Sequence, residues 1–504
     1  MEEMTILELQ EKMRSGEYSV RTITEMYLER IEEIDRQGPK LNAIIELNPD
    51  ALEIADSLDA ERKEKGARGP MHGIPVVLKD NINTGDRMMT TAGSLALVGS
   101  IALRDSFVAQ KLREAGAIIL GKANLTEWAN FRGRNSIDGW SSRGGLTLNP
   151  YALDRNPGGS SSGSAVAVAA NLCSVAVGTE TDGSIVCPAS ACSIVGIKPT
   201  VGLVSRSGII PISYSQDTAG PMARTVSDAA ILLGAMTGMD TRDPATQESD
   251  GKSCTDYTSF LDPNGIQGAR IGVARMLFGF DDRVDKIIKG CIEEMKRLGA
   301  EIIDPAKPAK TWRMTKRLNQ IRTRVITHEF KTGLANYLAE LRENAVVHSL
   351  KEIIEFNEQN KEKVMPYFGQ EALLRAEKQR PLKDEYYKAT VQEIRRLVGA
   401  DGIDALIHQY RLDAIIAPTV GPPHLNDFIS VAYSRMGGSS SPAAMAGYPH
   451  ISIPAGYMYG LPVGISFFAG AYQEPQLIKL AFAFEQVAKV RRPPQFPPTA
   501  NLES

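Results

Sequence analysis

The chain has 504 residues, 43% of them hydrophobic and 23% charged, a balance that is typical of a globular protein with a sizeable core and that excludes disorder. Its 57 Lys and Arg residues against 60 Asp and Glu residues give a net charge of -3. No overall basic field therefore attracts a polyanion. We expect neither a nucleic-acid partner nor association with a membrane surface.

The cysteine pattern and the N-terminus indicate the compartment. The five cysteines are sparse and odd in number, which argues against a disulfide framework. Cys187 and Cys192 lie close in sequence, but no histidine is near them to complete a tetrahedral zinc site, so we interpret them as buried thiols. Residues 1–10 are acidic and polar, unlike a signal peptide, and the apolar stretch 165–177 is too short to span a membrane. These features predict a cytoplasmic protein.

Apolar periodicity predicts the order of elements. Residues 6–34 fit two amphipathic helices, the second with Ser19 available as its N-cap. After residue 70, short apolar runs alternate with helical stretches such as 106–115 and 226–236. The runs predict strands at 74–78, 117–120, 174–177, 194–197 and 271–273. This alternation is typical of an α/β fold with a largely parallel or mixed sheet that helices cover on both faces.

The sequence changes character between residues 311 and 396. This segment is charged and poor in glycine, and its apolar residues fall at helical offsets, as at Leu334, Leu338 and Leu341. We interpret it as a helical insertion in a position to cover a site. Apolar runs return at 414–417, 450–454 and 462–468, before a helix at 476–487. The C-terminal sequence is therefore expected to complete the sheet.

Three polar segments carry the candidate chemistry. The loop 158–164 enters good helix-forming sequence, so its free N–H groups suit an anion or an oxyanion, although it lacks the Gly-Lys-Ser/Thr of a phosphate loop. Twenty-four residues after Ser160, the run 178–185 places Ser184 in a flexible turn at the end of a predicted strand. Lys79 ends another strand, where desolvation would lower its pKa from about 10.4 towards that of a useful base. Singly, each segment also fits a structural role, such as a Gly-rich turn or a lysine that reaches solvent.

Together, these segments resemble the amidase signature family. The resemblance continues through most of the chain, at 120–124, 196–200, 217–224, 416–419 and 461–464. It implies a single α/β domain over residues 1–504, built around a twisted mixed sheet, with 311–396 as an insertion within it. It also implies that the protein uses neither a metal nor a cofactor.

The resemblance further implies a Ser-cisSer-Lys catalytic triad. Ser184 matches the nucleophile, Ser160 matches the bridging serine at a cis peptide bond, and Lys79 matches the base. Backbone N–H groups near Thr181, Asp182, Gly183 and Ser184 would form the oxyanion hole. Such a site cleaves carboxamide bonds through an acyl-serine intermediate.

Departures from the common family pattern bear on the substrate. Many members have Asp-Thr-Gly-Gly-Ser-Ile-Arg at the nucleophile, whereas this chain has Glu-Thr-Asp-Gly-Ser-Ile-Val at 180–186. This variant looks most like the peptide amidase branch, whose members remove the C-terminal amide of peptides. Asp182 would then either bind a substrate amide or stabilise the turn. Trp128, Asn130 and Trp140 are the candidate substrate-binding residues, although the two tryptophans taken alone are better explained by ordinary core packing.

Several alternatives remain at this level. Within the family, the chain could be an aryl acylamidase, another small-amide hydrolase, or the glutaminase-type A subunit of a tRNA-dependent amidotransferase. The Thr-Asp-Gly turn argues against the last of these. A binding module that has lost activity would have no reason to keep all three triad residues, and neither Ser160 nor Ser184 lies in the Gly-x-Ser-x-Gly of a histidine-dependent hydrolase. We expect a small-molecule or short peptide amide as substrate and no obligatory protein partner.

Overall fold

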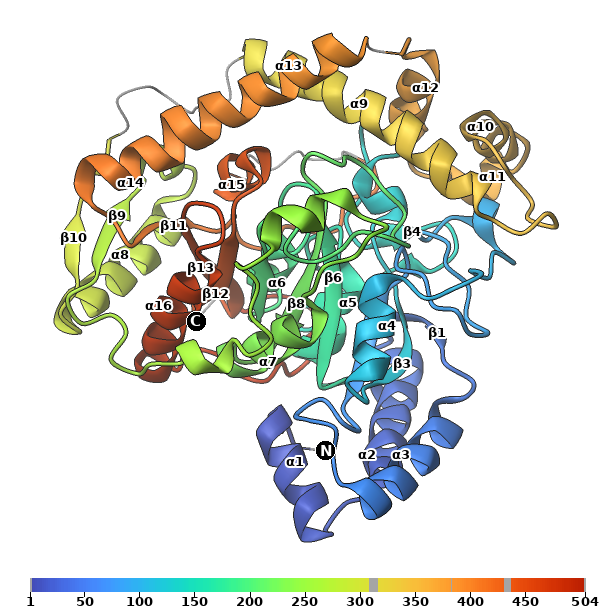
Figure 1. Ribbon diagram of the computed structural model, residues 1–504, viewed down its shortest axis with the longest axis horizontal. Coiled ribbons are helices and arrows are strands. Elements are labelled where there is room, and N and C mark those ends of the chain that lie inside the picture. The colour runs from blue at the N-terminus through green and yellow to red at the C-terminus, as the bar shows by residue number, and fades with distance from the viewer. Residues whose placement is uncertain (1, 308–315, 382, 430–436, 503–504) are drawn as a thin grey trace.

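The computed structural model describes residues 2–307, 316–381, 383–429 and 437–502. Its central feature is an 11-stranded mixed sheet (Figure 1). In spatial order the strands are β1 (Ile44–Leu47), β3 (Ile118–Ala123), β2 (Pro75–Lys79), β6 (Val175–Glu180), β8 (Thr218–Ala223), β7 (Val195–Lys198), β12 (His450–Met458), β13 (Leu461–Phe468), β11 (Ala414–Pro418), β9 (Arg270–Val273) and β10 (Glu301–Ile303). A separate hairpin pairs β4 (Trp140–Ser141) with β5 (Gly145–Leu146).

Both faces of the sheet are covered. Every residue of β2, β3, β6, β7, β8, β11 and β13 is buried. Because successive side chains of a strand point to opposite faces, burial of every position requires cover on both sides. Parallel pairs, such as β2 with β3 and β6, occur beside antiparallel ones, such as β6 with β8. The predicted α/β class with a mixed, doubly covered sheet is confirmed.

The predicted helices form where their caps and periodicity indicate. The Ser19 side chain accepts a hydrogen bond from the Thr22 N–H at the start of the second helix, as expected of an N-cap. The helices outside the segment 311–396 are α1 (Ile6–Ser15), α2 (Val20–Arg30), α3 (Ala51–Lys65), α4 (Phe107–Glu114), α5 (Ser162–Ala169), α6 (Val186–Ala191), α7 (Val226–Met236), α8 (Asp282–Arg297), α14 (Ala405–Tyr410), α15 (Ser440–Ala446) and α16 (Glu474–Ala488).

Some strands are not among the predicted runs. β8 lies in the middle of the sheet between β6 and β7, yet its sequence contains Gly220 and Pro221, which ordinarily argue against a central strand. Gly220 is needed there because a Cβ at this position would lie 2.1 Å from the carbonyl oxygen of Ile197. The edge strands β1 and β10 have only four and three residues, too few to give a clear alternation.

Between β10 and β11 the described chain is helical. It forms α9 (Lys316–Ala339), α10 (Leu350–Gln359), α11 (Lys361–Val364), α12 (Glu371–Lys378) and α13 (Asp384–Arg395). Residues 311–315 and 382 of the predicted insertion lie outside the described residues. Figure 1 shows α9 and α13 crossing the upper edge of the view, above the sheet. Leu318 and Val325 of α9 pack with Ile394 of α13 and with Met445 of α15.

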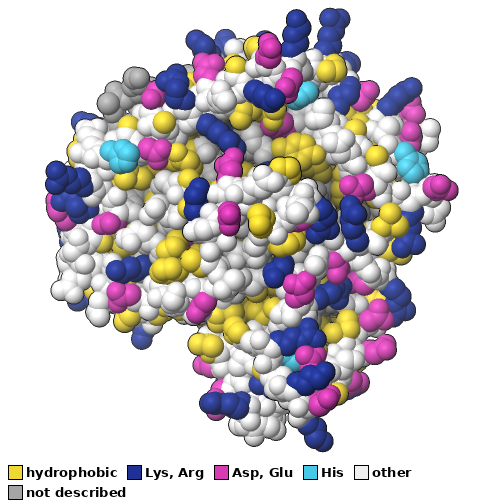
Figure 2. Space-filling model, viewed as in Figure 1, with side chains coloured by type: hydrophobic (Ala, Val, Ile, Leu, Met, Phe, Trp, Pro, Cys, Tyr) yellow, Lys and Arg dark blue, Asp and Glu magenta, His cyan; other side chains and the backbone are white. Residues whose placement is uncertain are grey.

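Surface charge is mixed. Figure 2 shows Lys and Arg side chains interspersed with Asp and Glu over the face in view. This agrees with the small net charge of the sequence. Within the described parts of the chain, no helix combines the length and apolar character that crossing a bilayer requires.

Candidate active site

Lys79 is the last residue of β2 and is completely buried. Its Nζ lies 2.8 Å from Ser160 Oγ and 2.9 Å from Ser161 Oγ. It also donates to the carbonyl oxygen of Thr179 over 3.1 Å. Because Lys79 ends β2, its amine lies in contact with the Gly/Ser loop 158–164. Lys79 does not reach solvent.

Burial also sets the charge of this amine. Desolvation lowers the pKa of Lys79 to about 7, because a buried ammonium loses its hydration, while the nearby carboxylates of Glu180 and Asp217 act in the opposite direction. Near neutral pH a large fraction of Lys79 is thus uncharged. In the uncharged form the contact with Ser160 has the serine hydroxyl donating to Nζ, as a general base requires.

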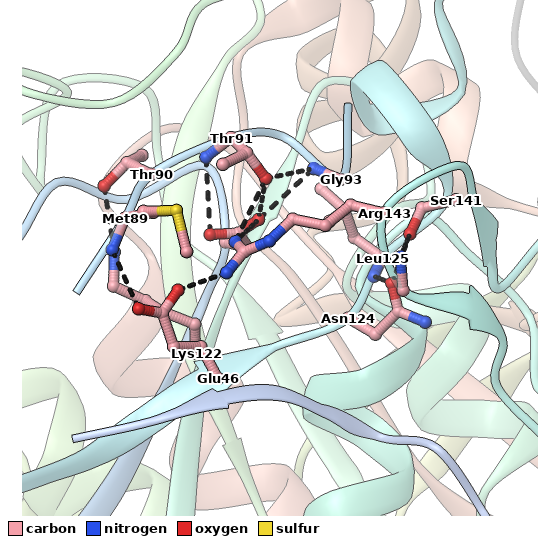
Figure 3. Close-up of polar contacts among 12 residues, drawn as sticks. Glu46, Met89, Thr90, Thr91, Gly93, Lys122, Asn124, Leu125, Ser141 and Arg143 are labelled. Atoms are coloured by element: carbon pink, nitrogen blue, oxygen red, sulfur yellow. Dashed lines mark hydrogen bonds and ion pairs between the residues drawn. The ribbon is translucent and has the colours of Figure 1, made fainter. Parts of the chain in front are cut away.

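The carboxylate of Asp80, next in sequence to Lys79, belongs to a separate buried network (Figure 3). It accepts hydrogen bonds from Thr91 and from the Gly93 N–H, and it forms an ion pair of 3.2 Å with Arg143. Figure 3 shows Arg143 reaching from this group to Glu46, with which it forms a second ion pair. The network neutralises a negative charge beside Lys79 and holds the end of β2 in place.

Ser160 lies in a crowded loop ahead of α5. The Gly159–Ser160 peptide bond is cis, as the family resemblance implies. A Cβ at residue 159 would lie 2.5 Å from Thr126 Oγ1 and 2.6 Å from Asp138 Oδ1, so the loop requires glycine at this close approach. The carbonyl oxygen of Ser160 accepts a hydrogen bond of 3.1 Å from the Thr126 N–H.

Ser161 is a member of this cluster that the sequence interpretation missed. Its hydroxyl accepts from Lys79 and from the Thr179 N–H, and donates to the Thr179 carbonyl oxygen over 3.0 Å. Gly159 and Gly163 place it in a Gly-x-Ser-x-Gly pattern, but no histidine contacts it among the described residues. Its bonds make it a support for the lysine and for the end of β6.

Ser184 lies in the turn after β6 and is 8% exposed. Its carbonyl oxygen accepts a hydrogen bond of 3.0 Å from the Ser161 N–H, which ties the two loops together. The Ser184 hydroxyl makes no hydrogen bond with the residues that the structure describes. The structure thus joins Lys79 to Ser160 directly and brings the two serine loops into contact. The hydrogen bond from Ser184 to Ser160 is not among those present.

Glu180 organises the turn that carries Ser184. Its buried carboxylate accepts hydrogen bonds from the N–H groups of Gly183 (2.7 Å), Ile185 (2.7 Å) and Val186 (3.1 Å). Burial raises the pKa of Glu180, and Lys198 opposes this shift. The residue stands where the common family pattern has Asp, but the sequence does not reveal its contacts.

This geometry changes the set of candidate oxyanion donors. The Gly183 N–H already donates to Glu180, so it is committed elsewhere. The N–H groups of Thr181, Asp182 and Ser184 belong to the same short turn and have no acceptor within the described chain. Of the predicted donors, Thr181, Asp182 and Ser184 therefore retain a free N–H, and Gly183 does not.

The carboxylate of Asp182 is engaged by protein groups. It accepts hydrogen bonds of 2.7 Å from both Ser440 and Ser441, and Arg322 of α9 donates to it over 2.6 Å. Of the two roles considered for Asp182, these contacts favour support of the turn over binding of a substrate amide.

Asp217 supports the same turn from the start of β8. Its carboxylate accepts a hydrogen bond of 2.6 Å from Thr181 Oγ1, and others from the N–H groups of Ile212 and Ser213. Burial raises the pKa of Asp217 to about 6. The sequence contains Asp217 in a family-like motif, but nothing local in it predicts a contact with residue 181.

Comparison with known proteins agrees with this geometry. The family model described as Amidase matches residues 22–478. A probable amidase of Arabidopsis thaliana is 42% identical over 98% of this chain and 92% of its own length. The crystal structure of native peptide amidase from Stenotrophomonas maltophilia is 47% identical, with a TM-score of 0.91 and 98% of each chain covered. A peptide amidase structure in complex with the competitive inhibitor chymostatin is 47% identical, with a TM-score of 0.92 over 98% of this chain and 99% of that one.

This chain belongs to the amidase signature family. It is an amidase, a hydrolase that acts on linear amides. Within the described residues, this amidase has no group of three or more His, Cys, Asp or Glu side chains placed to hold a metal ion.

The three predicted substrate-binding residues of the amidase differ in exposure and in packing partners. Trp128 is 1% exposed and packs in a cluster with Phe330 and Leu334 of α9, whereas Asn130 is exposed. Trp140 is in edge contact with Tyr367 and Phe368, at centroid distances of 5.6 and 5.2 Å. Both tryptophans thus pack in clusters that include residues of the helical segment, and their role towards substrate stays a prediction.

A cavity of about 420 Å³ in the amidase lies between the end of β6 and α9. It borders the turn at Thr181 and Asp217, and Tyr337 of α9 forms part of its wall. Its lining includes none of Lys79, Ser160 and Ser184, nor the three predicted substrate-binding residues. The cavity therefore borders the turn, but the side chains of the proposed triad do not form part of its wall.

Proposed function

We propose that this amidase removes the C-terminal carboxamide of peptides, or cleaves closely related small amides, through an acyl ester on Ser184. The observation that carries the reaction is the contact of 2.8 Å between a buried Lys79 and Ser160. The substrate class is supported by the similarity to peptide amidase structures over nearly the whole chain.

The proposed relay starts from the uncharged amine of Lys79. Lys79 takes a proton from Ser160 as Ser160 takes one from Ser184, and Ser184 Oγ bonds to the carbonyl carbon of the substrate. This step requires a Ser184 rotamer that directs its hydroxyl to Ser160. The free N–H groups of the turn then hold the oxyanion, at roughly 3 kcal/mol of transition-state stabilisation for each donor.

The second half of the reaction reverses the proton path. Ser160 returns its proton to the leaving nitrogen as the C–N bond breaks, and the amine departs. A water molecule then attacks the acyl ester with the same relay as base, which regenerates the Ser184 hydroxyl and releases the carboxylic acid.

A substrate panel tests this proposal and its alternatives. Purified protein is given peptide amides, anilides, glutamine and fatty amides, and the products are identified by mass. We expect the highest kcat/KM with peptide amides, with ammonia as coproduct. A preference for anilides would instead indicate an aryl acylamidase, and activity restricted to glutamine would indicate an amidotransferase A subunit.

Variants test the catalytic roles. Ser184→Ala is expected to abolish turnover, Lys79→Ala to reduce it by several orders of magnitude, and Ser160→Ala to fall between these or equal them. Ser57→Ala, an exposed serine on α3, serves as the matched control and should leave turnover unchanged. Undiminished activity in Lys79→Ala would contradict the proposed proton relay.

A further inference from the structure

The carboxylate of Asp138 lies against the peptide unit that carries Ser160. A Cβ at Gly159 would lie 2.6 Å from Asp138 Oδ1 and 2.9 Å from its Cγ, so the carboxyl group packs directly on the residue before the bridging serine. Asp138 is only partly buried. One oxygen therefore lies against the residue that precedes Ser160, on a side chain that the protein does not fully enclose.

This carboxylate has almost no partner within the described chain. Its single hydrogen bond there comes from Thr126 Oγ1 over 3.4 Å, close to the limit for such a bond. None of the described cations forms an ion pair with it. Burial raises the pKa of Asp138, and the nearby His424 acts in the opposite direction. The Asp138 carboxylate can therefore accept further hydrogen bonds, because an ionised carboxylate offers about four acceptor sites.

The other acids around the site differ in this respect. Glu180, Asp182 and Asp217 each accept three hydrogen bonds from protein groups. These hydrogen bonds show that the three carboxylates support the turn that carries Ser184. Asp138 accepts only one long hydrogen bond, although it packs against Gly159 in the first serine loop.

The backbone around Asp138 is held without help from its side chain. The Gly139 N–H donates to Thr126 Oγ1 over 3.0 Å, and Asn156 donates to the Asp138 carbonyl oxygen over 3.3 Å. The same loop is anchored five residues later by Arg143, between Glu46 and Asp80 (Figure 3). The carboxylate is thus presented from a fixed loop, as a binding group should be.

The reaction indicates which group this carboxylate meets. In the proposed function, on which this inference rests, Ser160 protonates the leaving nitrogen, so that nitrogen must lie next to Ser160. A primary carboxamide carries two N–H groups there, a secondary amide carries one, and an ester carries none. A carboxylate accepts such N–H groups in charge-assisted hydrogen bonds.

We infer that Asp138 is a specificity residue, whose carboxylate accepts a hydrogen bond from the leaving nitrogen and so selects primary amides. Because the contact exists only for substrates with an N–H, it contributes to amide turnover and not to ester turnover. An ammonium group on the acyl part of the substrate is the competing occupant.

The test uses substrates that share one acyl group. The full-length wild type, Asp138→Asn and Asp138→Ala are compared on a blocked peptide amide, its N-methylamide and its methyl ester. We expect kcat/KM for the primary amide to fall about tenfold in Asp138→Asn and up to about a hundredfold in Asp138→Ala. Ester kcat/KM should change less than about threefold, which also reports an intact fold and acylation step.

Controls separate the outcomes. Asp154→Asn, whose carboxylate accepts from Thr499 away from the serine loops, should change neither substrate class. Equal losses on amide and ester, or no loss on either, would overturn the inference. The unblocked form of the same peptide amide is the fourth substrate. A loss on this substrate with none on the blocked amide would also overturn the inference and would assign Asp138 to the acyl side.

The inference and the proposed function fail in different ways. If the wild type does not cleave peptide amides, the proposed function is wrong. The role of Asp138 is then tested with a primary amide that the enzyme does cleave and with the matching ester. A wild type that cleaves peptide amides, with variants that keep its ratio of amide to ester turnover, contradicts the role of Asp138 alone.

Discussion

At the scale of single residues, the charge of Lys79 is decided by its surroundings. Complete burial favours the uncharged amine, and the carboxylates of Glu180 and Asp217 limit the effect. The resulting pKa of about 7 places the base close to neutral pH, where general-base catalysis is most efficient.

This pKa has a consequence for stability. Lys79 has a pKa of about 7 in the folded chain and about 10.4 when unfolded, so between these values the unfolded chain binds more protons. Stability contributed by this group therefore rises with pH across that window. We expect the stability of Lys79→Met relative to wild type to be greatest near pH 7 and to decline by about 1.4 kcal/mol per pH unit up to pH 10.

Denaturant unfolding of both proteins at pH 7, 8, 9 and 10 measures this difference. Lys289→Met, an exposed lysine of α8, is the control and should show no such trend relative to wild type. A difference between Lys79→Met and wild type that stays constant with pH would mean that Lys79 is charged in the folded protein.

At the scale of elements, α9 is joined to the turn that carries Ser184, the proposed nucleophile. Arg322 of α9 donates to Asp182 over 2.6 Å and to Gln216 over 3.3 Å, and Gln216 donates to the Thr181 carbonyl oxygen over 2.9 Å. The Arg322 and Asp182 side chains are 16% and 15% exposed, so their ion pair is partly shielded from solvent. The helical segment thus helps to hold the turn that carries the proposed oxyanion donors.

Removal of this arginine should impair turnover more than folding. In Arg322→Ala, Asp182 keeps its two serine donors but loses its cation, so the turn remains while its position loosens. We expect kcat to fall by about tenfold with a small change in Tm, measured by steady-state kinetics and calorimetry. Arg324→Ala, on the exposed side of the same helix, should keep wild-type kcat. Equal kcat in the two variants would show that the contact of α9 with the turn does not affect turnover.

At the scale of the whole molecule, sheet topology brings the site together. β2 and β6 are neighbouring parallel strands, so their carboxyl ends, with Lys79 and the turn of Ser184, meet at one edge. β8 is antiparallel to β6, so its beginning, preceded by Asp217, lies at the same edge. Segments more than 100 residues apart in sequence thereby converge.

The core also determines the state of the thiols. All five cysteines are free, and Cys173, Cys192 and Cys291 are buried, where desolvation raises their pKa. We expect a thiol reagent to label at most Cys187 and Cys254 in the native protein, and all five residues in denaturant. Mass spectrometry of the labelled chain gives the count. Rapid native labelling of more than two thiols would contradict the packing described.

The sequence by itself determined the strand-and-helix alternation, most strand positions and the three residues that match the family triad. These features are local: apolar runs, turn residues and short motifs are readable in order along the chain. β8 was missed because its Gly and Pro are tolerated only through close packing against neighbours, which no local pattern reveals.

Only the tertiary structure decided which polar groups are free and which are committed. The contacts of Asp182 with Arg322 and Ser440 depend on how the turn after β6 meets α9 and α15. The same holds for Asp138, whose unused carboxylate stands out only when every neighbouring hydrogen bond is known. Burial and hydrogen bonding are properties of the assembled fold, because they depend on residues that are remote in sequence.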